Sequence, residues 1–293
     1  MDDMNALKNF KPSKDFFVGL DSDGCVFPTM ELKHKECFCP NFIRHFGFQS
    51  VSRFARETWE FVNLYSRDRG ANRFPALLKS IELLIARPEF KRSATGAPDT
   101  AWLIKFIASD KPKSNAGLKE FLKENDNPDL RHLLAWSESV NRDIDAMVHD
   151  VRPFGLVRES LEKIFPKADM MVVSGTPFGA LEKEWKEHGI DRFAKLTCGQ
   201  EQGTKKEHLS IAAKGRYPTG HVLMVGDAPG DHKAATANSA LFFPINPGNE
   251  EGSWEVFYAE ALDRFFQGTY KGEFENRLVK EFYGLLPDKP GWK

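Results

Sequence analysis

Residues 16–24 read Phe-Phe-Val-Gly-Leu-Asp-Ser-Asp-Gly, a short apolar run that ends in two aspartates one residue apart. The apolar part predicts a strand, and α/β sheets bind ligands at the carboxyl ends of their strands. Because neighbouring carboxylates repel each other, both ionise easily only with a cation between them, and Mg²⁺ takes such oxygen ligands. An aspartate can also act as a nucleophile that carries a phosphoryl group. Taken alone, the segment fits equally well a strand that ends in an ordinary Asx turn.

A second apolar run, residues 222–225, also ends in an acidic loop. Gly226 and Asp227 follow it, and Asp231 lies four residues after Asp227 across a Pro-Gly turn. A helix is predicted over residues 232–238. We therefore expect these carboxylates and those of the first segment to converge at one end of a parallel sheet, close enough to share a metal ion.

Two further segments lie between these in the sequence. Residues 170–173 form another predicted strand, and Ser174 and Gly175 follow it in a small turn that is rich in hydrogen-bond donors. Lys205 and Lys206 stand at the predicted start of a helix. A lysine at a helix start is by itself an ordinary solvated charge, so its meaning depends on the other motifs.

In their order along the chain, the aspartate pair, the strand-end serine, the helix-start lysine and the Gly-Asp-x-x-x-Asp segment resemble the four motifs of the haloacid dehalogenase (HAD) superfamily of phosphotransferases. The resemblance covers residues 14–27 and 151–245 and says much less about the segment between them. It implies an α/β fold, with a Rossmann-like parallel-sheet core and an inserted all-helical cap of the C1 type. Caps of this family close over the site, exclude water and choose the substrate.

The segment between the motifs has the pattern of such an insertion. Residues 28–151 place apolar residues at three- and four-residue steps without strand alternation, which is typical of helices. We therefore expect residues 28–151 to form a separate helical cap domain, and residues 1–27 and 152–293 to form the α/β core. Core strands are expected near 15–20, 169–173, 194–198, 221–225 and 239–243, with a polar lead over 1–14 and a helical tail over 254–286.

The resemblance assigns roles to the acidic residues of the motifs. It makes Asp21 the nucleophile that becomes an aspartyl-phosphate. It makes Asp23 the acid that protonates the leaving oxygen and then the base that deprotonates the hydrolytic water. It implies that Mg²⁺ is held by Asp21, Asp227 and the backbone carbonyl of Asp23. Asp231 is expected to support the metal directly or through water.

The resemblance also assigns the groups that bind phosphate. Ser174 is expected to donate a hydrogen bond to a phosphoryl oxygen, and Gly175 belongs to the same phosphate-binding turn. A lysine is expected to neutralise the charge on the phosphoryl group. Lys205 fits the family pattern better than Lys206, and because neighbouring helix residues point ~100° apart, one of the two is expected to face solvent.

These roles predict a Mg²⁺-dependent phosphohydrolase that acts on a small phosphorylated metabolite through an aspartyl-phosphate. The carboxylate of Asp23 favours phosphate esters over the substrates of dehalogenases and phosphonate-cleaving relatives. A phosphomutase of the sugar-phosphate type, with the same catalytic residues, stays an alternative. A non-catalytic protein that binds a phosphorylated ligand is the third reading, but it would be expected to lack Asp21, Asp23 or Asp227, and all are present. The motifs name neither the substrate nor the oligomeric state.

The composition narrows the class of protein. The chain has 293 residues, a hydrophobic content of 41% and a net charge of −1, which argues against an electrostatic nucleic-acid or membrane partner. No apolar stretch approaches the roughly 20 residues that span a bilayer, and the first residues lack the apolar core of a signal peptide. We therefore expect a soluble cytoplasmic protein. The four cysteines predict no disulfide framework, and the spacing of His34, Cys37 and Cys39 matches no common zinc site.

Overall fold

A computed structural model describes residues 3–292, which form two compact units. The first unit contains residues 3–30 and 150–287, and the second contains residues 31–149 and 288–292. The domain bounds 1–27 with 152–293 and 28–151 stay a prediction from the sequence. Residues 288–292, at the C-terminus, belong to the second unit.

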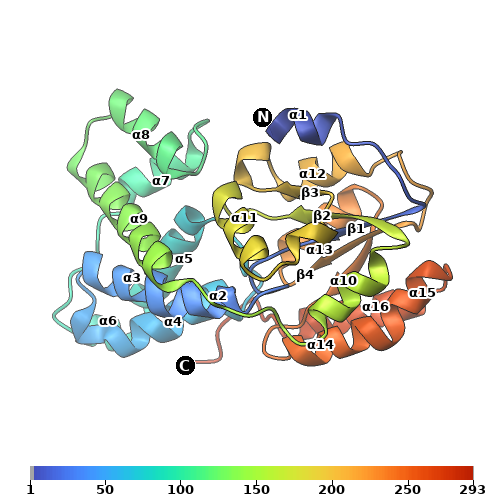
Figure 1. The fold of residues 1–293 in the computed structure, drawn as a ribbon. Helices are drawn as coiled ribbons and strands as arrows, with labels where there is room; N and C mark the ends of the chain where they lie inside the picture. Colours follow the sequence, from blue (N-terminus) through green and yellow to red (C-terminus); the bar gives the residue numbers. More distant parts are fainter. Residues whose placement is uncertain (1–2, 293) are drawn as a thin grey trace. The chain divides into compact units, whose positions relative to one another are not determined.

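The first unit is built on five parallel strands, β1 (Phe16–Leu20), β2 (Ala168–Val173), β3 (Leu196–Cys198), β4 (Val222–Gly226) and β5 (Leu241–Pro244). Their order in the sheet is β3-β2-β1-β4-β5 (Figure 1). The chain therefore adds β2 and β3 on one side of β1, and then crosses to add β4 and β5 on the other side. This reversal between β1 and β4 is where open α/β sheets bind ligands. The predicted α/β class with a parallel sheet is confirmed.

Successive side chains of each strand point to opposite faces of the sheet, and both faces are buried. This explains why the strands read as continuous apolar runs rather than as alternating ones. One face carries Val18, Leu20, Met170, Val172, Leu223, Val225, Leu241 and Phe243. The other face carries Phe17, Met171, Val173, Cys198, Val222, Met224 and Phe242.

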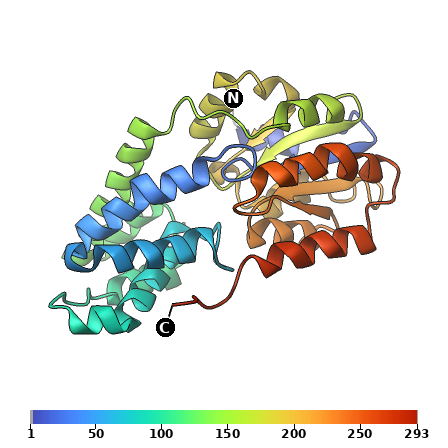
Figure 2. The ribbon, with the colours of Figure 1, turned by 90° about the horizontal axis from the view of Figure 1, so that it is seen from below.

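Helices cover both faces of the sheet. The first face packs against α10 (Val157–Ile164), α11 (Phe178–Glu187), α14 (Glu250–Val256), the π-helix Phe257–Ala261 and α15 (Leu262–Phe266). The second face packs against α1 (Asp3–Lys8), α12 (Lys205–Ala212), α13 (Pro229–Ala237) and the C-terminal half of α16 (Glu273–Gly284). In Figure 2 the orange and red helices of the tail lie together beside the sheet.

The sequence missed α1 and misplaced two boundaries. Residues 1–14 were expected to be a polar lead, but residues 3–8 form α1, and Leu7 and Phe10 are buried against the sheet. Helix α13 begins at Pro229, three residues before the predicted start, since proline needs no N–H partner in the first turn. Strand β5 begins at Leu241 because Ser239 has a left-handed φ of 56° that a strand cannot accommodate.

The second unit is helical, and its residues 31–149 contain no strand. Its elements are α2 (Thr29–Leu32), which straddles the division, the π-helix Lys33–Phe38, α3 (Cys39–His45), a 3-10 turn Gln49–Val51, α4 (Ser52–Leu64), α5 (Arg73–Ala86), α6 (Pro88–Arg92), α7 (Ala101–Ala108), α8 (Asn115–Glu124) and α9 (Pro128–Met147). Side-chain caps from Asn72, Ser114 and Asn127 begin α5, α8 and α9. Fully buried aromatic side chains such as Phe42, Trp59 and Trp136 fill its core.

Aromatic and charged contacts explain why the C-terminal segment belongs to the helical unit. The Trp292 ring lies 5.2 Å from the ring of Phe61, and the guanidinium of Arg87 lies 4.5 Å from the Trp292 ring. Asp288 forms an ion pair with Arg67. No motif of the sequence pointed to these pairings, because they join residues more than 200 positions apart.

Two further observations concern the cysteines and the character of the helices. All four cysteines are buried, and none forms a disulfide. None of the helices in residues 3–292 combines the length and the apolar character that a membrane span requires.

Candidate active site

Three predicted site residues leave neighbouring strands at the same edge of the sheet. Asp21 follows β1, Ser174 follows β2 and Asp227 follows β4. The amide of Asp21 donates to the carbonyl of Val225 (3.0 Å), and the amide of Ser174 donates to the carbonyl of Cys198 (3.0 Å). These bonds extend the sheet ladder by one residue, so the side chains start from fixed positions.

Three carboxylates cluster at this edge. One oxygen each of Asp21, Asp227 and Asp231 lies within 4.8 Å of the others, and the three residues are 4%, 1% and 0% exposed. Lys205 reaches the cluster from α12, with its Nζ 2.6 Å from Asp21 Oδ2 and 2.6 Å from Asp231 Oδ1. The side chain of Lys206 is exposed, as expected for the residue that points the other way.

Burial disfavours the charged forms of two groups in the cluster, Asp231 and Lys205. Burial raises the pKa of Asp231 above its ordinary range, and Asp21 adds to this effect while Lys205 opposes it. Burial also disfavours the Lys205 ammonium, but Asp21 and Asp231 outweigh it and hold the pKa of Lys205 well above its usual value. Lys205 is therefore charged at neutral pH, whereas the raised pKa of Asp231 would fall if a further cation lay beside it.

Two glycines allow the groups to come this close. A Cβ at Gly19 would lie 3.1–3.2 Å from Met224, Leu209 and Val173, so the glycine lets α12 pack tightly on β1 and brings Lys205 to Asp21. A Cβ at Gly226 would lie 2.4 Å from the carboxyl carbon of Asp231. The glycine before Asp227 thus makes room for the second carboxylate of its own motif.

Helix starts orient two of the charged groups. Thr204 caps α12, and its amide and hydroxyl donate to Glu207, so Lys205 occupies the first helical position. At α13 the Oδ2 atom of Asp231 accepts the amide of Ala228 (3.0 Å) while its Oδ1 atom accepts Lys205. Asp231 thereby fixes both the helix and the lysine, and Pro229-Gly230 is the first helical turn rather than a loop.

Asp23 lies outside this cluster and has its own partners. The hydroxyl of Thr29 donates to its Oδ1 (2.5 Å), and the hydroxyl of Thr176 donates to its Oδ2 (2.8 Å). Both carboxylate oxygens of Asp23 thus accept a hydroxyl from a neighbouring segment, whereas Asp21 is in contact with Lys205.

The turn after β2 supplies further polar groups. Ser174 is buried, and its Oγ accepts the amide of Thr176 (3.2 Å), which leaves the hydroxyl proton to donate elsewhere. Gly175 is exposed and no side chain or backbone atom stands where its Cβ would be, so its backbone is accessible.

The donor set of the cluster fits Mg²⁺. Carboxylate oxygens are the ligands that this hard cation prefers, and a divalent ion would offset the burial and the Asp21 charge that raise the pKa of Asp231. The role of the Asp23 carbonyl stays a prediction.

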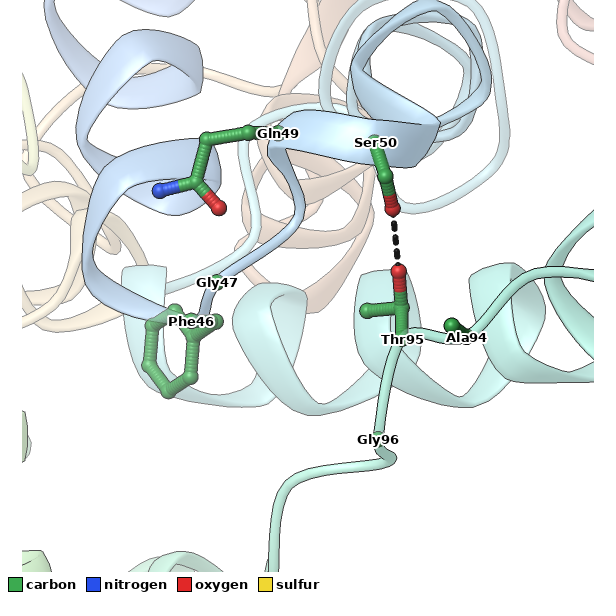
Figure 3. A pocket seen from close by; sticks show the side chains of 7 residues that line it. All are labelled: Phe46, Gly47, Gln49, Ser50, Ala94, Thr95 and Gly96. Carbon is green, nitrogen blue, oxygen red and sulfur yellow. Dashed lines mark hydrogen bonds between the residues drawn. The ribbon is translucent and has the colours of Figure 1, made fainter.

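A cavity of about 480 Å³ lies in the helical unit rather than among these residues (Figure 3). Its walls include Phe46, Gln49 and the hydrogen-bonded hydroxyls of Ser50 and Thr95. The side chains that line it carry no carboxylate, lysine or thiol, so the cavity lacks the groups that transfer a phosphoryl group.

Sequence reasoning missed the residues that hold the first motif in place. Thr29 and Thr176 contact Asp23, and Trp185 and Glu184 contact Ser22. The position of Thr176 two residues after Ser174 was the one available signal. The other contacts join segments up to 163 residues apart, and no local pattern predicts them.

No model of a known protein family matches the sequence, and no curated protein matches it. Solved structures do match. One is described as a predicted phosphoglycolate phosphatase from Haemophilus somnus, at 13% identity over 82% of this chain and 89% of that chain, with a TM-score of 0.45. A candidate beta-phosphoglucomutase from Bacteroides vulgatus matches at 16% identity over 89% and 93%, with a TM-score of 0.46. A candidate HAD-hydrolase from Bacillus subtilis, bound to magnesium, matches at 14% identity over 80% and 89%, with a TM-score of 0.42.

At identities of 13–16% and TM-scores below 0.5, these matches assign no activity to this chain.

Proposed function

We propose that this chain is a Mg²⁺-dependent phosphohydrolase of the HAD superfamily that removes phosphate from a small phosphorylated metabolite. The observation that carries the proposal is the contact of Lys205 with both Asp21 and Asp231, beside Asp227, at the carboxyl edge of the sheet. An ionised carboxylate next to a buried lysine and further carboxylates is suited to bind a phosphoryl group together with a metal ion.

In the first step, a carboxylate oxygen of Asp21 attacks the phosphorus atom. The bond between phosphorus and the ester oxygen breaks, and an aspartyl-phosphate forms on Asp21. Asp23 in its protonated form gives its proton to the departing oxygen, so that an alcohol leaves. Lys205 and the hydroxyl of Ser174 bind the phosphoryl oxygens and offset their charge.

In the second step, water attacks the phosphorus of the aspartyl-phosphate. Asp23, now ionised, takes a proton from that water, which restores the acid for the next cycle. Inorganic phosphate leaves, and the Asp21 carboxylate is regenerated. The hydroxyls of Thr29 and Thr176 hold Asp23 where both transfers require it.

Mg²⁺ held by Asp21 and Asp227, with Asp231 in support, would neutralise phosphoryl charge and orient the phosphate. We further propose that the helical unit serves as the cap that selects the substrate.

The test is phosphate release over a panel of phosphorylated metabolites, with Mg²⁺ and with EDTA. The proposal expects release that EDTA abolishes and that added Mg²⁺ restores. Transfer of the phosphoryl group to a second sugar hydroxyl, without release into water, would identify the phosphomutase instead. Release that is unaffected by EDTA and by Asp21→Asn would refute both enzymes.

A further inference from the structure

Ser22, the residue between the two aspartates of the first motif, uses every polar group it has. Its amide donates to Asp21 Oδ1 (2.8 Å). Its carbonyl accepts three amides, those of Cys25 (3.2 Å), Val26 (2.9 Å) and Phe27 (3.1 Å). The loop that follows β1 is therefore folded around the Ser22 peptide, and the direction of the Asp21 carboxylate depends on it.

The hydroxyl of Ser22 ties this loop to α11. It accepts the indole N–H of Trp185 (3.0 Å) and donates to Glu184 Oε2 (3.0 Å). Ser22 is 0% exposed and Trp185 is 1% exposed, so water does not compete for the hydrogen bond between the hydroxyl and the indole. A buried serine at this place would cost free energy without such partners.

The segment that contains Thr176 and α11 contacts the loop after β1 at further points. Thr176, just before α11, donates to Asp23, and the Trp185 ring packs edge-on against Phe27 at 6.2 Å. The turn that carries Ser174 and the loop that carries Asp21 are thus joined through one helix. Their relative position is what an attack on a bound phosphoryl group requires.

We propose that Ser22, Trp185 and Glu184 form a positioning relay that fixes the direction of the Asp21 carboxylate toward the phosphoryl group. The inference rests on the proposed function. None of the three residues touches the substrate in this account; they act through the Ser22 peptide. Loss of the relay lets the loop sample other directions, which lowers kcat, while Lys205 and Ser174 still bind phosphate and keep KM.

The experiment compares Ser22→Ala, which deletes the hydroxyl, with Trp185→Phe, which keeps a ring against Phe27 and removes the N–H. Small misplacements of reacting groups cost up to ~100-fold in rate, so we expect kcat to fall about 10–100-fold for Ser22→Ala and about 3–10-fold for Trp185→Phe. KM should stay within about 2-fold in both variants. The fall in kcat of the double variant should be smaller than the product of the two single effects, since both substitutions remove the same hydrogen bond between Trp185 and Ser22.

Three variants separate positioning from stability. Tyr270→Phe removes a buried hydroxyl that donates to the carbonyl of Phe242 (2.7 Å) in the same unit, and it should lower Tm without lowering kcat. Glu184→Gln keeps an oxygen that can accept the Ser22 hydroxyl, and it should retain most of the kcat that Glu184→Ala loses. Hydrogen exchange at the amides of residues 25–27 should speed up in Ser22→Ala beyond the change in Tyr270→Phe.

Unchanged kcat in folded Ser22→Ala and Trp185→Phe would overturn the relay, as would unchanged exchange at residues 25–27. An effect on KM alone would also contradict it. Failure of the proposed function looks different: the unaltered protein would release no phosphate, or Asp21→Asn would keep its activity. The exchange measurement then still decides whether the hydroxyl holds the loop.

Discussion

At the amino end of β2 the buried carboxylate of Asp169 is surrounded by donors, whereas at the carboxyl end of the same sheet three buried carboxylates crowd together. Asp169 is 2% exposed and accepts bonds from the amide (2.7 Å) and hydroxyl (2.5 Å) of Ser13, the amide of Lys14 (3.2 Å), Tyr217 (2.8 Å) and Lys195 (3.1 Å). At the other end, Asp21, Asp227 and Asp231 place oxygens within 4.8 Å of one another.

The pKa shifts of the two ends have opposite signs. Burial opposes ionisation of Asp169, but the bonds from Ser13, Tyr217 and Lys195 outweigh it and lower its pKa. Burial and the nearby Asp21 raise the pKa of Asp231 despite Lys205. One end of the sheet is thus organised for stability, and the other keeps like charges together at a cost to stability. Such a cost is expected where the groups serve binding or catalysis.

The largest difference between the ends should appear in catalysis when the nucleophile is removed. Asp21→Asn keeps the volume of the side chain but cannot attack phosphorus, so phosphate release should fall by about 10⁴-fold or more. Thermal unfolding should show a Tm equal to or above that of the unaltered protein, since one of three crowded carboxylates is gone. A large loss of Tm would mean that this end is structural, like the other.

Asp23→Asn tests the acid and base next to the cluster. Its loss should cost about 10²–10⁴-fold in rate with ordinary esters. With a nitrophenyl ester the leaving group needs no acid, so the first step should suffer less. Single-turnover kinetics with both esters would check this, and equal losses on the two esters would contradict the assignment.

Asp169→Ala should have the converse effect. Removing the carboxylate leaves buried donors of Ser13 and Tyr217 without an acceptor, so the free energy of unfolding should fall by about 3–5 kcal/mol. Below Tm, kcat should stay within about 2-fold, because no site residue touches Asp169. Urea unfolding and phosphate release measure the two quantities, with Tyr217→Phe as a milder control. Lost catalysis in the fully folded variant would break the comparison.

The pH dependence of stability should also follow Asp169. A carboxyl whose folded pKa lies below its unfolded value of about 3.9 stabilises the protein above that pH, and this contribution is lost as the pH falls through the folded pKa. The difference in unfolding free energy between the unaltered protein and Asp169→Asn should therefore shrink below about pH 4. A constant difference from pH 7 to 3 would show that Asp169 does not titrate as the structure requires.

The smallest expected effect is the change in stability on metal binding. If Mg²⁺ binds the cluster, 10-fold excess over Kd adds about 1.4 kcal/mol of stability, a rise in Tm of about 3–6 °C. Asp227→Asn should abolish the rise, while Asp169→Asn should keep it. Equal responses in both variants would place the metal elsewhere.

The sequence predicted the carboxyl end of the sheet far better than the amino end. Each apolar run that ends in Asp21, Ser174 or Asp227 is a strand, and the parallel sheet follows from strands that alternate with helices. Asp169 stands at the start of an apolar run, and no local pattern indicates the five donors that surround it. No sequence pattern indicated the hydrogen bond between Ser22 and Trp185 either, since it depends on how α11 packs against the loop after β1. Local patterns predict strands and motifs, but buried polar partners are decided by tertiary packing.

The most direct measurement of the central claim is the identity of the phosphorylated residue. The unaltered protein and Asp23→Asn are mixed with a nitrophenyl phosphate ester and Mg²⁺, quenched in acid within milliseconds, digested and analysed by mass spectrometry. The account predicts a phosphoryl group on Asp21, accumulating in Asp23→Asn because the water has lost its base, and none in Asp21→Asn. Phosphate release without a covalent phosphoryl group, or a phosphoryl group on another residue such as Ser174, would contradict the account.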